Sequence, residues 1–175
     1  MREDGLVDPA EDEGDQEQRQ RIVRAASQAL AAAALGDDDT AVEHLIGFVR
    51  DSPDEHTDVR ELVLLLFAEC SRMVSELSAG GATPVRMQVF DAEGQEVPID
   101  EADPPVRTAV RTLLAEVHGD EQAAHDQIEI ALSSAVPAEM ATVLIQALRW
   151  TIRLAGACAE RSLSVPAWIS TALED

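Results

Sequence analysis

The chain of 175 residues has no lysine and no tyrosine, and aromatic residues make up only 3% of it. Without lysine there can be no Walker lysine, Schiff-base amine or lysine acid or base. The two cysteines, Cys70 and Cys158, both fall in apolar stretches. They predict buried, inert thiols and exclude a secreted disulfide framework. The apolar runs, such as residues 62–68, are too short to cross a bilayer.

Positive charge is also scarce, because arginine supplies all 13 basic residues against 34 acidic ones, and the net charge is -21. This charge repels nucleic acid phosphates and anionic membranes, so we expect neither as a partner. The charge favours binding to a basic protein surface, although the simpler explanation of so many acidic residues is that they keep the protein soluble. The first 20 residues lack the apolar core of a secretory signal, which predicts a cytoplasmic protein. Mimicry of nucleic acid ranks last, since the acids gather in the tail and at helix starts.

Small apolar residues return every three or four positions and predict closely packed helices. Residues 1–18 are acidic with few apolar side chains, so we expect a disordered acidic tail. Three helices then form a first unit over residues 19–78, and the third runs from about His56 to Leu77. Its apolar surface is wider than one stripe. This predicts either the central helix of the bundle or part of an oligomer interface.

The linker at residues 79–104 carries a different pattern. Apolar and polar residues alternate over residues 85–90, residues 91–94 have the composition of a turn, and residues 95–99 follow as a second extended segment. This pattern predicts a β-hairpin. Because an isolated hairpin is marginal in water, it must pack on the helices or pair with a second copy.

The second half, residues 105–175, repeats the plan and adds a short C-terminal helix. Gly119-Asp120 lies 83 residues after Gly36-Asp37, and the third helices align at an offset of 81, where Arg72 meets Arg153. We therefore predict a mostly α fold, a helical bundle of two similar three-helix units joined by a short β-hairpin, and an internal duplication. Chance agreement between helices rich in alanine and leucine is the alternative.

Residues 34–41 read Ala-Leu-Gly-Asp followed by three variable residues and Ala, and residues 117–124 read Val-His-Gly-Asp in the same frame. These phrases resemble the helix-turn-helix crossing of tetratricopeptide repeats, and Pro53 and Pro137 are placed like that family's closing proline. The resemblance covers two short segments. The repeat period, the aromatic positions and the long third helices depart from the family, so the chain shares its helix-hairpin chemistry without membership. The resemblance implies protein binding, by analogy.

Reactive groups are sparse. The histidines are His44, His56, His118 and His125, and their spacing gives no metal motif. The aspartates 37–39 fail as a calcium loop, because Phe48 stands where a bidentate glutamate is needed. Without a phosphate-binding loop or a nucleophile elbow, we expect no cofactor, no metal and no catalytic residue, and a non-enzymatic role is favoured.

Two candidate sites remain. A partner interface is predicted from apolar residues of the hairpin and the C-terminal helix: Val85, Met87, Val89, Trp168 and Ile169. An anion site between the units is predicted from Arg72 and Arg153. The simpler interpretations are a tryptophan that caps the core and arginines in structural ion pairs. We therefore predict a protein-interaction module that self-associates, as a homodimer, and docks a protein partner. The alternative is a small-molecule or anion-binding protein, or an enzyme, with a site between the repeats.

Overall fold

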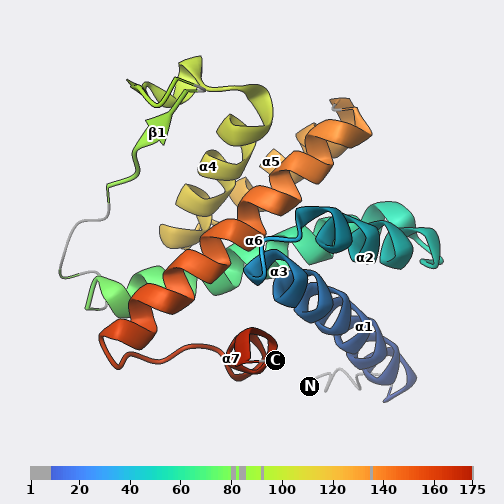
Figure 1. The fold of residues 1–175 in the computed structure, drawn as a ribbon. Coiled ribbons are helices and arrows are strands. Elements are labelled where there is room, and N and C mark those ends of the chain that lie inside the picture. Colours follow the sequence, from blue (N-terminus) through green and yellow to red (C-terminus); the bar gives the residue numbers. More distant parts are fainter. Residues whose placement is uncertain (1–8, 80–81, 83–85, 92, 135, 175) are drawn as a thin grey trace, which may run out of the picture.

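A computed structural model describes residues 9–79, 82, 86–91, 93–134 and 136–174 of the chain. These residues form seven α-helices, one 3-10 turn and a two-stranded antiparallel hairpin, which confirms the mostly α bundle (Figure 1). The helices are α1 (Pro9–Ala34), α2 (Asp38–Arg50), α3 (Glu55–Leu77), α4 (Pro104–Val117), α5 (Glu121–Ser134), α6 (Pro137–Glu160) and α7 (Ala167–Glu174).

The first two helices of each unit form a helical hairpin with the same kind of junction. Gly36 and Gly119 adopt positive φ values of 80° and 72°, which glycine reaches without a Cβ clash. The next residue caps the following helix in both cases. The Asp37 carboxylate accepts from the Thr40 amide at 3.0 Å, and the Asp120 carboxylate accepts from the Ala123 amide at 3.0 Å.

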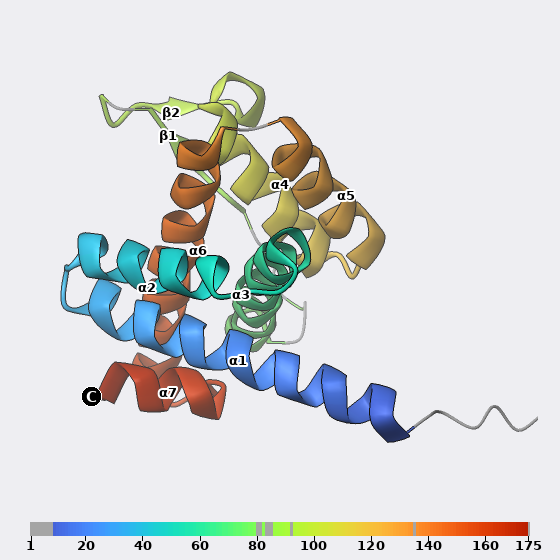
Figure 2. The same ribbon diagram turned by 90° about the vertical axis from the view of Figure 1, so that its right-hand side faces the viewer.

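The long helices α3 and α6 cross at the centre of the molecule (Figure 1). Helix α3 packs on α4 and α5 of the second unit, while α6 packs on α1 and α2 of the first. In Figure 2, α3 lies between the α1–α2 pair and the α4–α5 pair. Leu62, Leu66 and Phe67 on α3 are fully buried, so the wide apolar surface belongs to a central helix. The units share their order of elements, and the duplication itself stays a prediction.

The hairpin consists of β1 (Val89–Phe90) and β2 (Glu96–Val97), paired antiparallel with Val89 opposite Val97. The strands are shorter than the alternation predicts. The turn closes through the Asp91 carboxylate, which accepts from the amides of Glu93 and Gln95 at 3.0 and 2.8 Å. Val89 is buried in a small second core that includes Val110 of α4. Of the two expected ways to stabilise the hairpin, the structure uses packing on the helices.

Helix α1 begins at Pro9, inside the stretch of residues 1–18 that the sequence predicts to be a disordered tail. Glu13, Asp15 and Glu17 in this stretch of the helix are exposed, and acidic residues such as these favour the prediction of a tail. The end of the predicted tail has a partner in the core. Gln18 Nε2 donates to Asp58 Oδ1 at 2.7 Å, and Arg21 Nη2 donates to Asp58 Oδ2 at 2.5 Å. Asp58 itself is buried at the start of α3.

Helix α7 packs on α1 and α6 and closes the bundle on the side of the C-terminus (Figure 2). Ile169 is fully buried there. Trp168 is half-buried, and its indole Nε1 donates to Glu69 Oε1 at 3.3 Å. Trp168 therefore caps the core, as the simpler interpretation of the sequence has it.

Candidate functional site

An apolar groove of about 910 Å³ lies between the two three-helix units. Helix α2 and the first turns of α6 supply most of its lining, and the loop between α2 and α3, the start of α3 and the end of α5 supply the rest. Nine of the lining residues are aliphatic or methionine: Val42, Leu45, Ile46, Val49, Val59, Leu132, Met140, Ala141 and Leu144. A concave surface of this size lined mainly by apolar side chains is typical of binding sites.

The groove exists because the apolar face of α2 is wider than the surface that the core covers. Ala41 and Leu45 are buried, at 0% and 3% exposure. Ile46, the next residue along the helix, remains 57% exposed and lines the groove. Covering an isoleucine side chain fully is worth about 1.5–3 kcal/mol, so Ile46 is an anchor point for anything that binds there.

Charged groups surround the apolar lining. Asp54 caps α3 and accepts from the Thr57 amide at 3.2 Å, and its hydrogen bonds with Thr57 lower the pKa of this carboxyl. Glu55 follows it on the lining, and Arg50 pairs with Asp51 at 3.7 Å. Near the other end of α2, Arg149 of α6 forms an ion pair with Asp38. Carboxylates therefore outnumber free positive charges around the groove.

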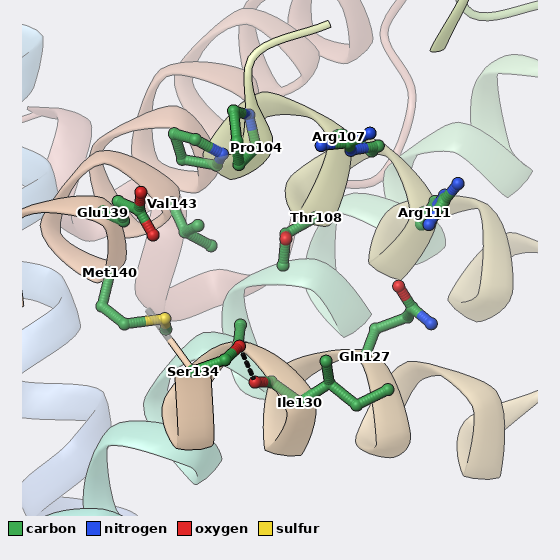
Figure 3. A pocket seen from close by; sticks show the side chains of 12 residues that line it. Pro104, Arg107, Thr108, Arg111, Gln127, Ile130, Ser134, Glu139, Met140 and Val143 are labelled. Carbon is green, nitrogen blue, oxygen red and sulfur yellow. Dashed lines mark hydrogen bonds between the residues drawn. The ribbon is translucent and has the colours of Figure 1, made fainter. Parts of the chain in front are cut away.

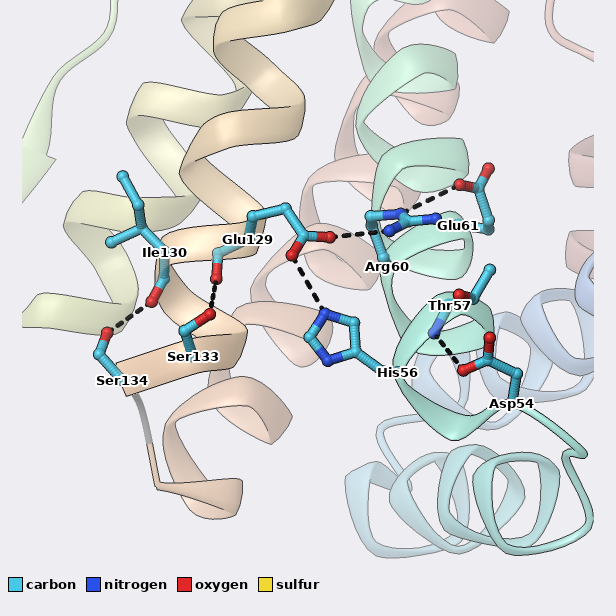
Figure 4. Close-up of polar contacts among 9 residues, drawn as sticks. All are labelled: Asp54, His56, Thr57, Arg60, Glu61, Glu129, Ile130, Ser133 and Ser134. Atoms are coloured by element: carbon cyan, nitrogen blue, oxygen red, sulfur yellow. Dashed lines mark hydrogen bonds and ion pairs between the residues drawn. The ribbon is translucent and has the colours of Figure 1, made fainter.

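The corresponding junction of the second unit is closed by a polar cluster (Figure 4). Glu129 of α5 accepts from Arg60 Nη1 at 2.8 Å and lies 3.1 Å from His56 Nε2, so it ties α5 to α3. The hydrogen bond from Arg60 and then that from His56 lower the pKa of Glu129. The same bond with Glu129 raises the pKa of Arg60. The contact brings α5 close to α3 and leaves His56 on the edge of the groove.

The difference between the two junctions lies in two aligned positions. At the offset of 83 residues, Ile46 of α2 aligns with Glu129 of α5, and at the offset of 81, Arg60 aligns with Ala141 of α6. An ion pair on one side thus corresponds to two apolar residues on the other. Where the ion pair closes one junction, isoleucine and alanine leave an open apolar groove at the other.

The predicted interface residues do not form an exposed surface. Val89 and Ile169 are buried at 5% and 0% exposure, and Met87 and Trp168 are half-buried against the core. Val85 lies outside the described residues. The alternation and the tryptophan were sound signals of packing, but the surface they pack against is the chain's own.

The predicted anion site does not assemble within the part of the chain that the structure describes. Arg72 and Arg153 are both exposed, and Arg72 pairs with the buried Glu69 at 3.4 Å. Arg72 lines a small pocket with Ser164 and Pro166, of about 270 Å³, to which Arg153 does not contribute. The structural ion pair is the better interpretation of Arg72.

Other chemistries find little support among the described residues. No group of three or more histidine, cysteine, aspartate or glutamate side chains is placed to hold a metal ion there. Cys70 is buried, and burial raises the pKa of its thiol to about 12. Within the described ranges, no helix combines the length and hydropathy that a membrane span needs.

Comparisons with known proteins give no relative from which to transfer a function. No family model matches the chain, and no curated protein or solved structure matches it. The groove is the feature of the chain that indicates a function. Its apolar residues on α2 were visible in the sequence, where Val42, Leu45, Ile46 and Val49 share one face. The alignment of Ile46 with Glu129 was the sequence signal that could have located the groove, because it pairs an apolar residue in one unit with a charged residue in the other.

Proposed function

We propose that the protein is a helical interaction module whose groove between α2, α3 and α6 docks an amphipathic helix of a basic partner protein. The observation that carries this proposal is the open apolar groove with Ile46 exposed on its wall. The protein acts by binding, with no chemical step.

The shape and lining of the groove suit a helix. Val42, Leu45, Ile46 and Val49 recur at the spacing of successive helical turns along α2. Met140 and Leu144 repeat one turn apart on α6. A partner helix with apolar residues at the same three- and four-residue spacing lays them into such a groove, which is a common mode of peptide recognition.

Charge selects the class of partner. The net charge of -21 repels any acidic protein, including a second copy of this chain. Asp54 and Glu55 stand beside the apolar lining, and Arg50 is already paired with Asp51. A helix with arginine or lysine beside its apolar face meets these carboxylates and associates faster because of them. We therefore place a basic partner ahead of self-association at this groove.

The test is a titration with model peptides followed by fluorescence anisotropy. One labelled peptide carries leucines on one face and arginines on the other, a second carries glutamates in place of the arginines, and a third has the basic sequence scrambled. We expect the basic helix to bind best. Ile46→Glu should weaken it by about tenfold or more, because the change puts an unpaired charge against the apolar face.

The matched control is Leu35→Glu. Leu35 is 84% exposed, lies in the turn between α1 and α2, and does not line the groove. The two variants add the same charge, so equal losses in both would assign the binding to overall charge and overturn the proposal. Binding of the basic and scrambled peptides with equal affinity would do the same. Light scattering that finds a wild-type dimer, lost in Ile46→Glu, would make a second copy the occupant.

A further inference from the structure

A second pocket, of about 270 Å³, lies between α4, α5 and α6 (Figure 3). It shares Met140 with the docking groove, and the rest of its lining is its own and is more polar. Arg107, Thr108 and Arg111 come from α4, Gln127 and Ser134 from α5, and Glu139 from α6. Met140 and Val143 of α6 add an apolar surface.

Two guanidinium groups stand one turn apart on α4. Arg111 pairs with Asp100 Oδ1 at 2.6 Å, and Arg107 Nη1 donates to the Asp100 carbonyl oxygen at 3.1 Å. Each guanidinium has five N–H donors, so both keep donors for a ligand. Among the described residues, Arg107 has no carboxylate within ion-pair distance, and its positive charge is uncompensated there.

Glu139 supplies the opposite charge on the other side of the pocket (Figure 3). It lies in the first turn of α6 and is half-buried. Within the described part of the chain, its carboxylate has no arginine or histidine partner at ion-pair distance, although the two arginines line the same pocket. Thr108 lies between the two charged sides, Gln127 lies on the side of Arg111, and both add neutral polar groups.

We infer that this pocket binds a small zwitterion of the amino acid class. Arg107 and Arg111 bind the carboxylate, Glu139 binds the ammonium group, and an apolar side chain lies against Met140 and Val143. The volume of about 270 Å³ lies just below the usual range of ligand pockets, which is roughly 300–1,000 Å³. A free amino acid fits this size, whereas a nucleotide does not.

The opposed charges decide between ligand classes. A phosphate or a plain carboxylate gains from the arginines but is repelled by Glu139. An amine gains from Glu139 but is repelled by the arginines. Only a ligand with both charges is attracted at both sides, and the gain for each charge-assisted hydrogen bond is larger than for a neutral one.

The test is methyl NMR of the full chain, following Val143 and Met140. The probes are L-leucine, 4-methylpentanoate, which lacks the amine, and 3-methylbutylamine, which lacks the carboxylate. We expect saturable shifts with L-leucine and at least about tenfold weaker binding of the other two. Absence of saturable shifts for L-leucine and for the other free amino acids at millimolar concentration would overturn the inference.

Two variants separate the roles. Glu139→Gln should weaken the binding of L-leucine and reduce the difference in affinity between L-leucine and 4-methylpentanoate. Arg107→Gln should weaken the binding of both of these carboxylate ligands. Arg86→Gln, at an exposed arginine of the hairpin, is the matched control and should change nothing. If Glu139→Gln leaves the preference for L-leucine unchanged, the ammonium site is wrong. Ile46→Glu should leave L-leucine binding intact, so failure of the docking groove and failure of this pocket are distinguishable.

Discussion

The thiol of Cys70 lies 3.3 Å from the hydroxyl of Thr151, at the point where α3 crosses α6. The Thr151 hydroxyl donates to the Ala147 carbonyl, so the thiol is the donor in the contact with Cys70. These residues are 81 positions apart, which is the offset that aligns the two third helices. Positions that the alignment makes equivalent therefore touch each other. The internal duplication stays a prediction.

The crossing also predicts where the fold is most sensitive. Phe67 is fully buried beside this point, and its ring meets the Trp150 ring edge-on with centroids 6.1 Å apart. Phe67→Ala should lower the free energy of unfolding by about 3–5 kcal/mol, because the change leaves a cavity and removes the ring contact. Urea unfolding followed by tryptophan fluorescence measures it. Phe90→Ala is the control: Phe90 is 54% exposed, and a loss as large as that of Phe67→Ala would contradict the assigned core.

A buried carboxylate ties the first helix to the third. Asp58 is 2% exposed and accepts hydrogen bonds from Gln18, Arg21 and Ser52, the last at 2.5 Å. Asp58→Ala should lower the free energy of unfolding by about 2–4 kcal/mol, because it removes three hydrogen bonds and leaves the half-buried donors of Gln18 and Ser52 without this acceptor. Chemical denaturation checks the value. Asp51→Ala removes an exposed carboxylate and should cost under about 0.5 kcal/mol.

Much of the fold follows from the sequence because local signals and packing agree. The period of the apolar residues predicts α3 from about His56, and the helix begins at Glu55. The junctions at Gly36 and Gly119 are set by glycine geometry and aspartate caps, which depend on neighbouring residues only. The sequence pattern places the start of the first helix after residue 18, whereas α1 begins at Pro9 and its Gln18 contacts Asp58, 40 residues away. No local pattern encodes that partner.

The candidate site was less predictable, for the same reason. An apolar residue on a helix face looks the same in a sequence whether another helix covers it or not. The predicted interface residues Val89 and Ile169 are covered, and Ile46 is exposed. The outcome depends on how far α2 stands from α6, which in turn depends on whether an ion pair such as Glu129–Arg60 draws the helices together. A single sequence carries that information only through the comparison of its two halves.

The polar cluster that closes the second junction predicts a dependence of stability on pH. Hydrogen bonds lower the pKa of Glu129 below its usual value of 4.5. A lowered folded pKa means that the ionised form stabilises the fold, so this contribution is present above 4.5 and is lost as the pH falls through the folded pKa. Glu129→Gln should therefore be less stable than wild type at neutral pH, and the difference should shrink on acidification below 4.5. Thermal unfolding of both proteins between neutral and acidic pH measures it.

The control for that prediction is Glu121→Gln, at an exposed glutamate of the same helix. It should show no comparable difference from wild type across the same pH range. A gap between wild type and Glu129→Gln that stays constant as the pH falls would contradict the assigned ion pair, because it would not follow the charge of the carboxylate.

The two cysteine thiols should be unreactive in the folded protein. Both are fully buried, and burial raises the pKa of Cys70 to about 12 and that of Cys158 above its usual value. At pH near 8 the Cys70 thiol is therefore ionised in only about one molecule in ten thousand, and the thiolate is the reactive form. With a disulfide reagent we expect labelling of the native protein to be at least about a thousandfold slower than in denaturant, because it must wait for opening of the fold.

Burial of the thiols also predicts that the free energy of unfolding decreases at alkaline pH. Because the folded state holds the Cys70 proton to a higher pH than the unfolded state does, stability should fall as the pH rises above the usual value of 9.0. Cys70→Ala removes the Cys70 contribution to this dependence, although its cavity lowers stability at every pH. Ser75→Cys places a thiol at an exposed position of the same helix and should react at the rate of a free thiol. Native-state labelling of Cys70 at a similar rate would mean that α3 and α6 do not pack around it.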